Sequence, residues 1–91
     1  LRGAERLKRL GGGEQALKLL ALPREVVLRA DVYDLSGRRI RALASGVYAA
    51  GRHTIRWDAR DDAGRAVAAG TYLYRIEAAG QTRSVKTTLV R

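Results

Sequence analysis

The 91-residue chain contains no cysteine, no methionine and no phenylalanine, and its only histidine is His53. Without cysteine, no disulfide framework can stabilise a domain of this size. A single imidazole, in a strand between Arg52 and Thr54, also makes neither a zinc site nor a Ser-His-Asp triad. We therefore expect stability to come from strand pairing and from packing of the few aromatic side chains, with a neighbouring domain as a further source.

Long apolar runs are missing as well. The longest stretch, residues 16–22, is interrupted by Lys18, whereas a helix that crosses a bilayer needs about 20 apolar residues. No membrane span is expected. The chain opens at Leu1 without a charged and then apolar leader. We interpret it as part of a longer protein whose export signal would lie upstream.

Basic residues outnumber acidic ones by 18 to 9, which gives a formal net charge of +9. Such a charge suggests nucleic acid or an anionic surface as a partner. Beyond the first ten residues, however, the basic residues are scattered, with Arg38-Arg39 as one adjacent pair, and most are arginine. A nucleic-acid footprint requires a clustered stripe with exposed aromatic rings. We therefore expect no nucleic-acid partner.

The secondary structure of the first 22 residues is less clearly indicated by the sequence. Leu7 and Leu10 could share a helical face, but ten residues are too few for a stable isolated helix. Three glycines at positions 11–13 then end any regular structure. We interpret residues 1–13 as a linker or the tail of a preceding element, and residues 14–91 as the domain. In residues 14–22, composition favours a helix and Pro23 favours a short strand, so both remain open.

Alternation is clearest in residues 26–33, where Leu28, Ala30 and Val32 alternate with polar residues or tyrosine. This period of two predicts a strand with one buried face. The segment from Asp34 to Gly37 supplies turn residues, so the strand should form a hairpin with residues 39–44.

Three further strands are predicted after a loop at residues 45–51. His53, Ile55 and Trp57 alternate in the first, and Tyr72, Tyr74 and Ile76 in the second. The last, residues 82–90, follows the Ala79-Gly80 turn. The fold class is thus all-β, an immunoglobulin-like (fibronectin-III-like) antiparallel sandwich of six to seven strands. The predicted core comprises Leu28, Val32, Ile55, Trp57, Tyr72, Tyr74 and Ile76.

Candidates for chemistry are few. Asp58, Asp61 and Asp62 precede Gly64 but lack the alternating acidic positions and terminal glutamate of a calcium loop, so they are interpreted as turn residues. No helix follows the glycines, which excludes a phosphate cradle. No carboxylate pair is placed for acid–base catalysis. We predict no enzyme activity and no cofactor. The predicted turn residues are Asp34, Gly37, Asp58, Asp61, Gly64 and Gly70.

Tyrosines offer one more alternative, a platform on which sugar rings would stack. Tyr33 and Tyr48 could contribute to it, but Tyr72 and Tyr74 share a face with Ile76. Core packing is therefore the favoured role of that pair.

Four blocks of sequence follow one another in a specific order. They are Val32-Tyr33-Asp34-Leu35-Ser36-Gly37-Arg38, Gly51-Arg52-His53-Thr54-Ile55-Arg56-Trp57-Asp58, Asp61-Asp62-Ala63-Gly64 and Ala69-Gly70-Thr71-Tyr72-Leu73-Tyr74-Arg75. Over about residues 16–91 the chain resembles the Ig-like domain of the flagellar hook-capping protein. It equally resembles the C-terminal sorting domains of type IX secretion. Leu22-Pro23 is similar to the pair that closes the first strand there, which favours a strand for residues 14–22.

The resemblance implies a non-catalytic module of an exported bacterial protein, extracellular or at the cell surface. Because the last strand is basic and ends at Arg91, our first hypothesis is a C-terminal sorting or cell-surface anchoring tag, with Lys86, Thr88 and Arg91 available to secretion machinery. The alternative is a structural module that contacts neighbouring domains or further copies through strand edges.

Overall fold

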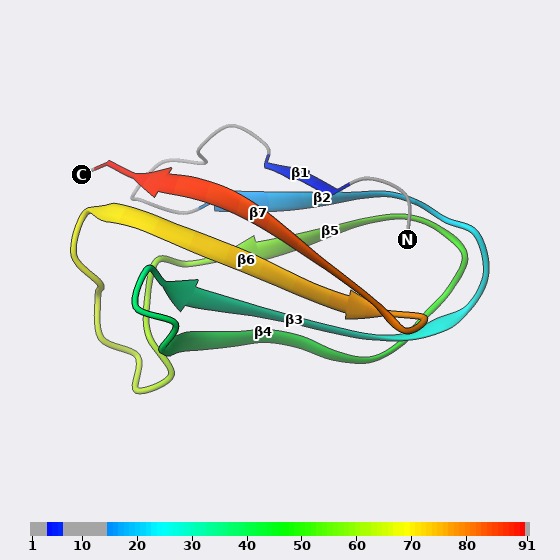
Figure 1. Ribbon diagram of the computed structural model, residues 1–91, viewed down its shortest axis with the longest axis horizontal. Helices are drawn as coiled ribbons and strands as arrows, with labels where there is room; N and C mark the ends of the chain where they lie inside the picture. The colour runs from blue at the N-terminus through cyan, green and yellow to red at the C-terminus, as the bar shows by residue number, and fades with distance from the viewer. Residues whose placement is uncertain (1–3, 7–14, 91) are drawn as a thin grey trace.

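The computed structural model describes residues 4–6 and 15–90. Seven β-strands run through these residues, and no helix lies among them (Figure 1). The strands are β1 (Ala4–Arg6), β2 (Gln15–Leu22), β3 (Val26–Asp34), β4 (Arg39–Tyr48), β5 (Gly51–Trp57), β6 (Gly70–Ala78) and β7 (Gln81–Leu89).

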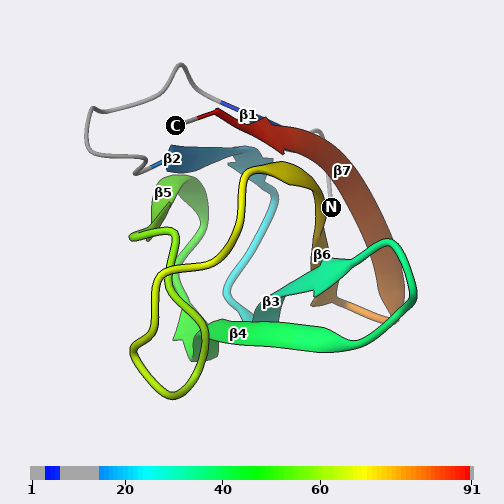
Figure 2. The ribbon, with the colours of Figure 1, turned by 90° about the vertical axis from the view of Figure 1, so that its left-hand side faces the viewer.

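The strands form two antiparallel sheets that pack face to face (Figures 1 and 2). One sheet has the order β1-β2-β5 and the other β4-β3-β6-β7. The hairpins β3–β4 and β6–β7 each stay within one sheet, while the other connections from β2 onward cross between sheets. This arrangement confirms the all-β, Ig-like sandwich expected from the alternation.

Alternate residues of both sheets fill the interior. All seven side chains predicted for the core are buried there, and Trp57 lies among the tyrosines. Its ring meets those of Tyr72 and Tyr74 edge to face, with centroids 5.3 and 6.2 Å away. The indole Nε1 donates to the carbonyl of Arg60 at 2.9 Å, so the one polar atom of the ring is satisfied.

A polar cluster in the core ties the two sheets together. Gln15 is buried, and its Oε1 accepts hydrogen bonds from Tyr74 Oη at 2.9 Å and from Thr87 Oγ1 at 2.5 Å. Its Nε2 donates to the carbonyl of Thr88 at 3.1 Å. One side chain of β2 therefore holds both β6 and β7.

Residues 15–22 of the ambiguous segment form a strand, β2, which pairs with β5 along most of its length and ends before Pro23. β1 pairs with β2 through Ala4–Arg6, a short strand that the linker interpretation did not include. The boundary between residues 13 and 14 lies outside the described residues and stays a prediction.

The prediction of a loop over residues 45–51 is wrong. β4 continues to Tyr48, since Val47 and Tyr48 pair with Val27 and Val26. Only two residues then separate β4 from β5. His53 closes this corner, with Nε2 2.7 Å from the carbonyl oxygen of Ala49 and its ring edge to face with Tyr48.

Smaller corrections concern the ends and faces of strands. β7 covers Gln81–Leu89, one residue earlier than predicted, because its register with β6 begins directly at the tight turn. Asp31 belongs to the set of residues expected to face solvent, yet it is buried. The β3–β4 register shifts beside Asp31, and Arg29 Nε lies 3.0 Å from Asp31 Oδ2.

Candidate interaction surface

The turn between β3 and β4 is built around Asp34. Its carbonyl accepts from the Gly37 N–H at 3.1 Å, and its N–H donates to the carbonyl of Arg38 at 3.0 Å. The carboxylate Oδ1 accepts from the N–H groups of Ser36 and Arg38 at 2.9 and 3.0 Å. Gly37 has a φ of 91°, which a residue with a Cβ adopts at a cost.

The loop between β5 and β6 contains a second copy of this turn. Asp61 accepts from the Gly64 N–H and donates to the carbonyl of Arg65, both at 2.9 Å. Its Oδ1 accepts from the N–H groups of Ala63 and Arg65 at 3.0 and 2.9 Å. Gly64 has a φ of 81°. The pattern Asp-x-x-Gly-Arg thus produces the same hydrogen bonds at two places in the chain.

Both turn carboxylates are held in the ionised form. The hydroxyl of Ser36 and then the N–H of Arg38 lower the pKa of Asp34 below its ordinary 3.8. The pKa of Asp61 is also lowered, first by the N–H of Arg65; desolvation opposes this shift, and the N–H of Ala63 adds to it. Each hydrogen bond favours the charged form because its acceptor is the carboxylate.

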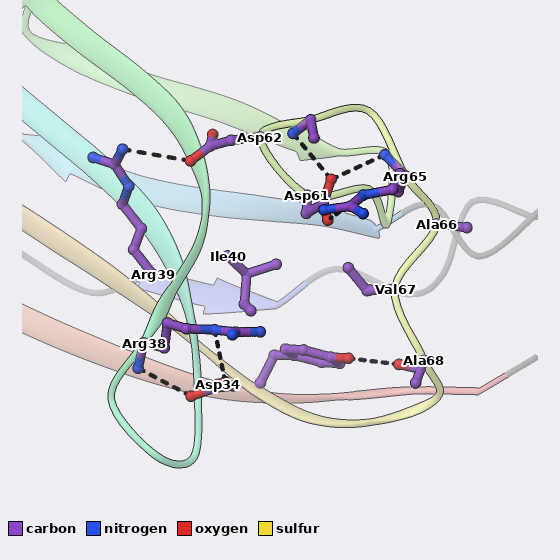
Figure 3. A pocket seen from close by; sticks show the side chains of 12 residues that line it. Asp34, Arg38, Arg39, Ile40, Asp61, Asp62, Arg65, Ala66, Val67 and Ala68 are labelled. Atoms are coloured by element: carbon purple, nitrogen blue, oxygen red, sulfur yellow. Dashed lines mark hydrogen bonds and ion pairs between the residues drawn. The ribbon is translucent and has the colours of Figure 1, made fainter.

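The two turns face each other across an open groove of about 500 Å³ (Figure 3). Ile40 and Val67 are the large aliphatic residues of its lining, and the Tyr72 hydroxyl donates to the carbonyl of Ala68 at 2.6 Å. The arginines of this groove are exposed, and each pairs with an aspartate: Arg38 with Asp34, Arg39 with Asp62, and Arg65 with Asp61.

Asp62 caps the first part of β4, one edge of the four-stranded sheet, at Ile40 and Ala42. β4 is an outer strand, so alternate N–H and C=O groups point away from β3. The Asp62 carboxylate accepts from the N–H of Ala42 at 2.9 Å, and the N–H of Asp62 donates to the carbonyl of Ile40 at 2.9 Å. The β5–β6 loop therefore caps β4 where another strand could have paired.

The three aspartates considered for calcium point at different partners. Asp58 Oδ1 accepts from the N–H of Arg60 at 3.1 Å and lies 3.6 Å from Arg41 Nη1. Asp61 accepts hydrogen bonds within its own turn. Asp62 accepts from the N–H of Ala42 on β4 and pairs with Arg39. Within residues 4–6 and 15–90 there is no group of three or more His, Cys, Asp or Glu side chains suited to a metal ion.

The opposite edge of this sheet is β7. Lys86 and Thr88, two of the predicted partner-binding residues, are exposed, while Thr87 and Leu89 are buried and Val85 is half-buried. The third, Arg91, lies outside the described residues. No acidic residue occurs between Gln81 and Leu89. β7 thus presents a basic and hydroxyl-rich edge.

The four tyrosines do not form a stacking platform. Tyr72 and Tyr74 are buried, Tyr48 packs on His53 at the β4–β5 corner, and Tyr33 is half-buried with Arg75 5.8 Å from its ring centroid. The described surfaces are turns and strand edges, which suit binding to another polypeptide.

The sequence contains a signal that the two predicted turns are alike. Asp34–Arg38 and Asp61–Arg65 share one five-residue pattern, visible as a repeat. Gln15 and Asp62 are harder to find, because their partners lie far away in the sequence and only the tertiary fold brings them together.

Comparison with known proteins gives one family. The model of the FlgD Ig-like domain matches residues 6–82. Among solved structures, FlgD from P. aeruginosa superposes with a TM-score of 0.58 and 25% identity, over 94% of this chain and 65% of that one. The chain thus spans less than two thirds of that structure. These matches support the hook-capping half of the resemblance and give no support to the type IX half.

A second solved structure, Pseudomonas fluorescens alkylpurine DNA glycosylase AlkC bound to DNA with an abasic site analogue, superposes with a TM-score of 0.46 and 15% identity, over 97% of this chain and 30% of that one. No curated protein matches the sequence. In the part of the chain that the structure describes, no helix is long and apolar enough to span a membrane.

Proposed function

Since the chain belongs to the FlgD Ig-like domain family, we propose that it is a non-catalytic structural module that holds an exported bacterial assembly of the hook-cap kind together through protein–protein contacts. In this proposal the domain acts outside the cell or at its surface, and its partners are other subunits of the assembly. The sandwich serves as a rigid support for its turns and edges.

The observation that carries the proposal is the unequal treatment of the two edges of the four-stranded sheet. Asp62, in the β5–β6 loop, caps β4 at Ile40 and Ala42, whereas β7 runs along the other side with exposed polar side chains. Proteins usually protect edge strands against unwanted pairing. The exposed N-terminal part of β7, on the edge opposite the capped end of β4, therefore supports a surface for a partner.

A second candidate is the sorting or anchoring tag, which Lys86 and Thr88 favour because both are exposed on a terminal edge strand. In that case the contact would be to secretion machinery and not to an assembly subunit. The two candidates share the edge and differ in the partner.

Site-specific crosslinking in the native host separates them. A benzophenone amino acid is placed at position 86 on β7 and, as a control surface, at position 52 on the outer face of β5 in the full-length parent protein. Mass spectrometry then identifies what each position captures. Subunits of an extracellular appendage, captured from either position, support the structural module. Capture of outer-membrane export components alone supports the tag, and absence of protein adducts from both positions contradicts both.

A further inference from the structure

We propose that the open edge of β7 accepts an extended acidic segment of a partner protein as an additional strand, over Thr82–Lys86. This inference rests on the proposed function and specifies how the partner is recognised. Main-chain hydrogen bonds would provide affinity and the charges of β7 would provide selectivity.

The tight turn before β7 determines which of its backbone groups are unpaired. Ala79 and Gly80 form a two-residue loop, and both have positive φ, 52° and 73°, as a type I′ hairpin turn requires. The residues that flank such a loop, Ala78 and Gln81, form a hydrogen-bonded pair. By alternation, Arg83, Val85 and Thr87 also bond to β6, and the N–H and C=O groups of Thr82, Ser84, Lys86 and Thr88 point outward.

An independent contact agrees with this assignment. The carbonyl of Thr88 accepts from Gln15 Nε2 at 3.1 Å, as expected of a group that faces away from β6. Gln15 also bonds Thr87, and β1 lies beside β7 (Figures 1 and 2). The C-terminal end of β7 is thus occupied by the other sheet.

The N-terminal part of β7 is more exposed than its C-terminal end. Its residues from Gln81 to Ser84 are exposed in succession, so both faces of the strand meet solvent there although it is paired to β6. The outward groups of Thr82, Ser84 and Lys86 can therefore pair with a segment of about five residues, the usual length of a strand. β4 offers no equivalent stretch beside Ile40 and Ala42, where Asp62 is bound.

The charges around this stretch identify the partner. Arg83 and Lys86 are exposed, and no ion pair involves either one within the described residues. Glu77 of β6, which pairs in register with Thr82, already forms an ion pair with Arg75, with Arg75 Nε 3.4 Å from Glu77 Oε1. A second copy of β7 would bring like charges together, which is unfavourable. β7 also carries no aromatic ring on which nucleic acid bases could stack. An acidic polypeptide satisfies both the backbone and the charges.

Amide hydrogen exchange on the free 91-residue chain tests whether the edge is open. The N–H groups of Ser84 and Lys86 should exchange at least tenfold faster than those of Arg83 and Val85, because only the latter pair bonds to β6. Equal protection of all four amides would overturn the inference and leave the proposed function standing.

Peptide titration followed by amide chemical shifts tests the partner. The probe is a capped seven-residue peptide in which glutamate and valine alternate, and the control peptide carries lysine in place of glutamate. We expect saturable shifts that are largest at Thr82–Lys86, slowed exchange of Ser84 and Lys86, and no response to the control peptide. Equal shifts with a short oligonucleotide, or dimerisation of the chain through β7, would overturn the acidic-peptide assignment.

Two matched pairs of variants separate backbone pairing from charge. Ser84→Pro removes an outward N–H and should abolish the slowed exchange of Lys86, whereas Ser84→Ala should retain it, since proline is tolerated on the free side of an edge strand. Arg83→Glu with Lys86→Glu should weaken binding about tenfold. The control is Arg52→Glu with Arg56→Glu on β5, which makes the same change in net charge elsewhere. An equal loss of peptide affinity in both double variants would show that only the net charge of the domain matters. That result would contradict the inference.

Discussion

Tyr74 donates its hydroxyl proton to Gln15 at 2.9 Å in the core, although the two residues lie 59 positions apart. Gln15 also receives the hydroxyl of Thr87, so a single amide oxygen satisfies two buried donors from adjacent strands. This contact joins the sheet that contains β2 to the sheet that contains β6 and β7. It fixes how the sandwich closes at this end.

Replacement of Gln15 by leucine should destabilise the domain by about 1–3 kcal/mol, because the buried hydroxyl of Thr87 loses its acceptor. Urea unfolding followed by tryptophan fluorescence measures the change. Tyr74→Phe alone should cost less, and the double variant should be more stable than the sum of the two single effects predicts. Strict additivity would show that the two side chains do not interact.

Trp57 should carry a large part of the stability. It is fully buried and contacts both Tyr72 and Tyr74, so Trp57→Ala should cost roughly 3–5 kcal/mol, comparable with the whole stability of a small domain. Trp57→Phe keeps an aromatic ring but loses the hydrogen bond to Arg60. Its stability should therefore lie between those of wild type and Trp57→Ala. Thermal unfolding by circular dichroism measures the series. A melting temperature of Trp57→Ala within a few degrees of wild type would contradict the assignment.

The two Asp-x-x-Gly-Arg turns should make stability depend on acid. Folding lowers the pKa of Asp34 and Asp61 below the ordinary 3.8. The two ionised carboxylates therefore stabilise the folded state fully at pH values above 3.8. It is lost as the pH falls from about 4 through the lower pKa values of the folded state. Asp34→Asn with Asp61→Asn keeps an acceptor oxygen but removes the titration. Melting temperatures between pH 6 and pH 2.5 should therefore fall less steeply in this variant than in wild type.

Calcium should leave the melting temperature unchanged at millimolar concentration. The carboxylates of Asp58, Asp61 and Asp62 already accept from backbone N–H groups that lie in different directions. A metal site would need these oxygens to converge. Magnesium at the same concentration controls for ionic strength. A rise of several degrees that calcium alone produces would indicate a bound ion, because ligand binding to the folded state must raise stability.

Alternation and turn residues were sufficient to predict most strands and the sandwich. Leu28, Ala30 and Val32 are buried as their period of two indicates, because side chains of a strand alternate between its faces. The continuation of β4 through Val47 and Tyr48 was missed, since Gly46 and the alanines after it look like a loop when their partners on β3 are unknown. Strand pairing is a non-local property, and a local pattern does not encode it.

The candidate surface was less predictable for the same reason. Turn chemistry at Asp34 and Asp61 is local, so the sequence indicated both turns. The cap on β4 depends on Asp62 and Ala42, which meet only after the β5–β6 loop folds back across the sheet. The open edge of β7 depends on hairpin register, and the parity of that register follows from the backbone angles at Ala79 and Gly80.

Removal of the Asp62 cap should convert β4 from a closed edge into an open one. Asp62→Ala deletes the acceptor for the N–H of Ala42 and the 3.4 Å pair with Arg39. Because the aspartate is partly exposed, the loss of stability should be small, roughly 0.5–1 kcal/mol. The larger effect should be on association, since an uncapped edge strand is a template for pairing with another chain.

Sedimentation velocity at increasing protein concentration measures that association, and amide exchange of Ala42 reports the cap itself. Asp62→Asn is the matched control, because its side-chain oxygen can still accept from Ala42 while its charge is gone. We expect Asp62→Ala to self-associate at concentrations where wild type and Asp62→Asn stay monomeric, with exchange of Ala42 about twofold to fivefold faster, as the loss of one exposed hydrogen bond implies. If Asp62→Ala stays monomeric although Ala42 exchanges freely, the carboxylate shapes the loop but does not guard the edge.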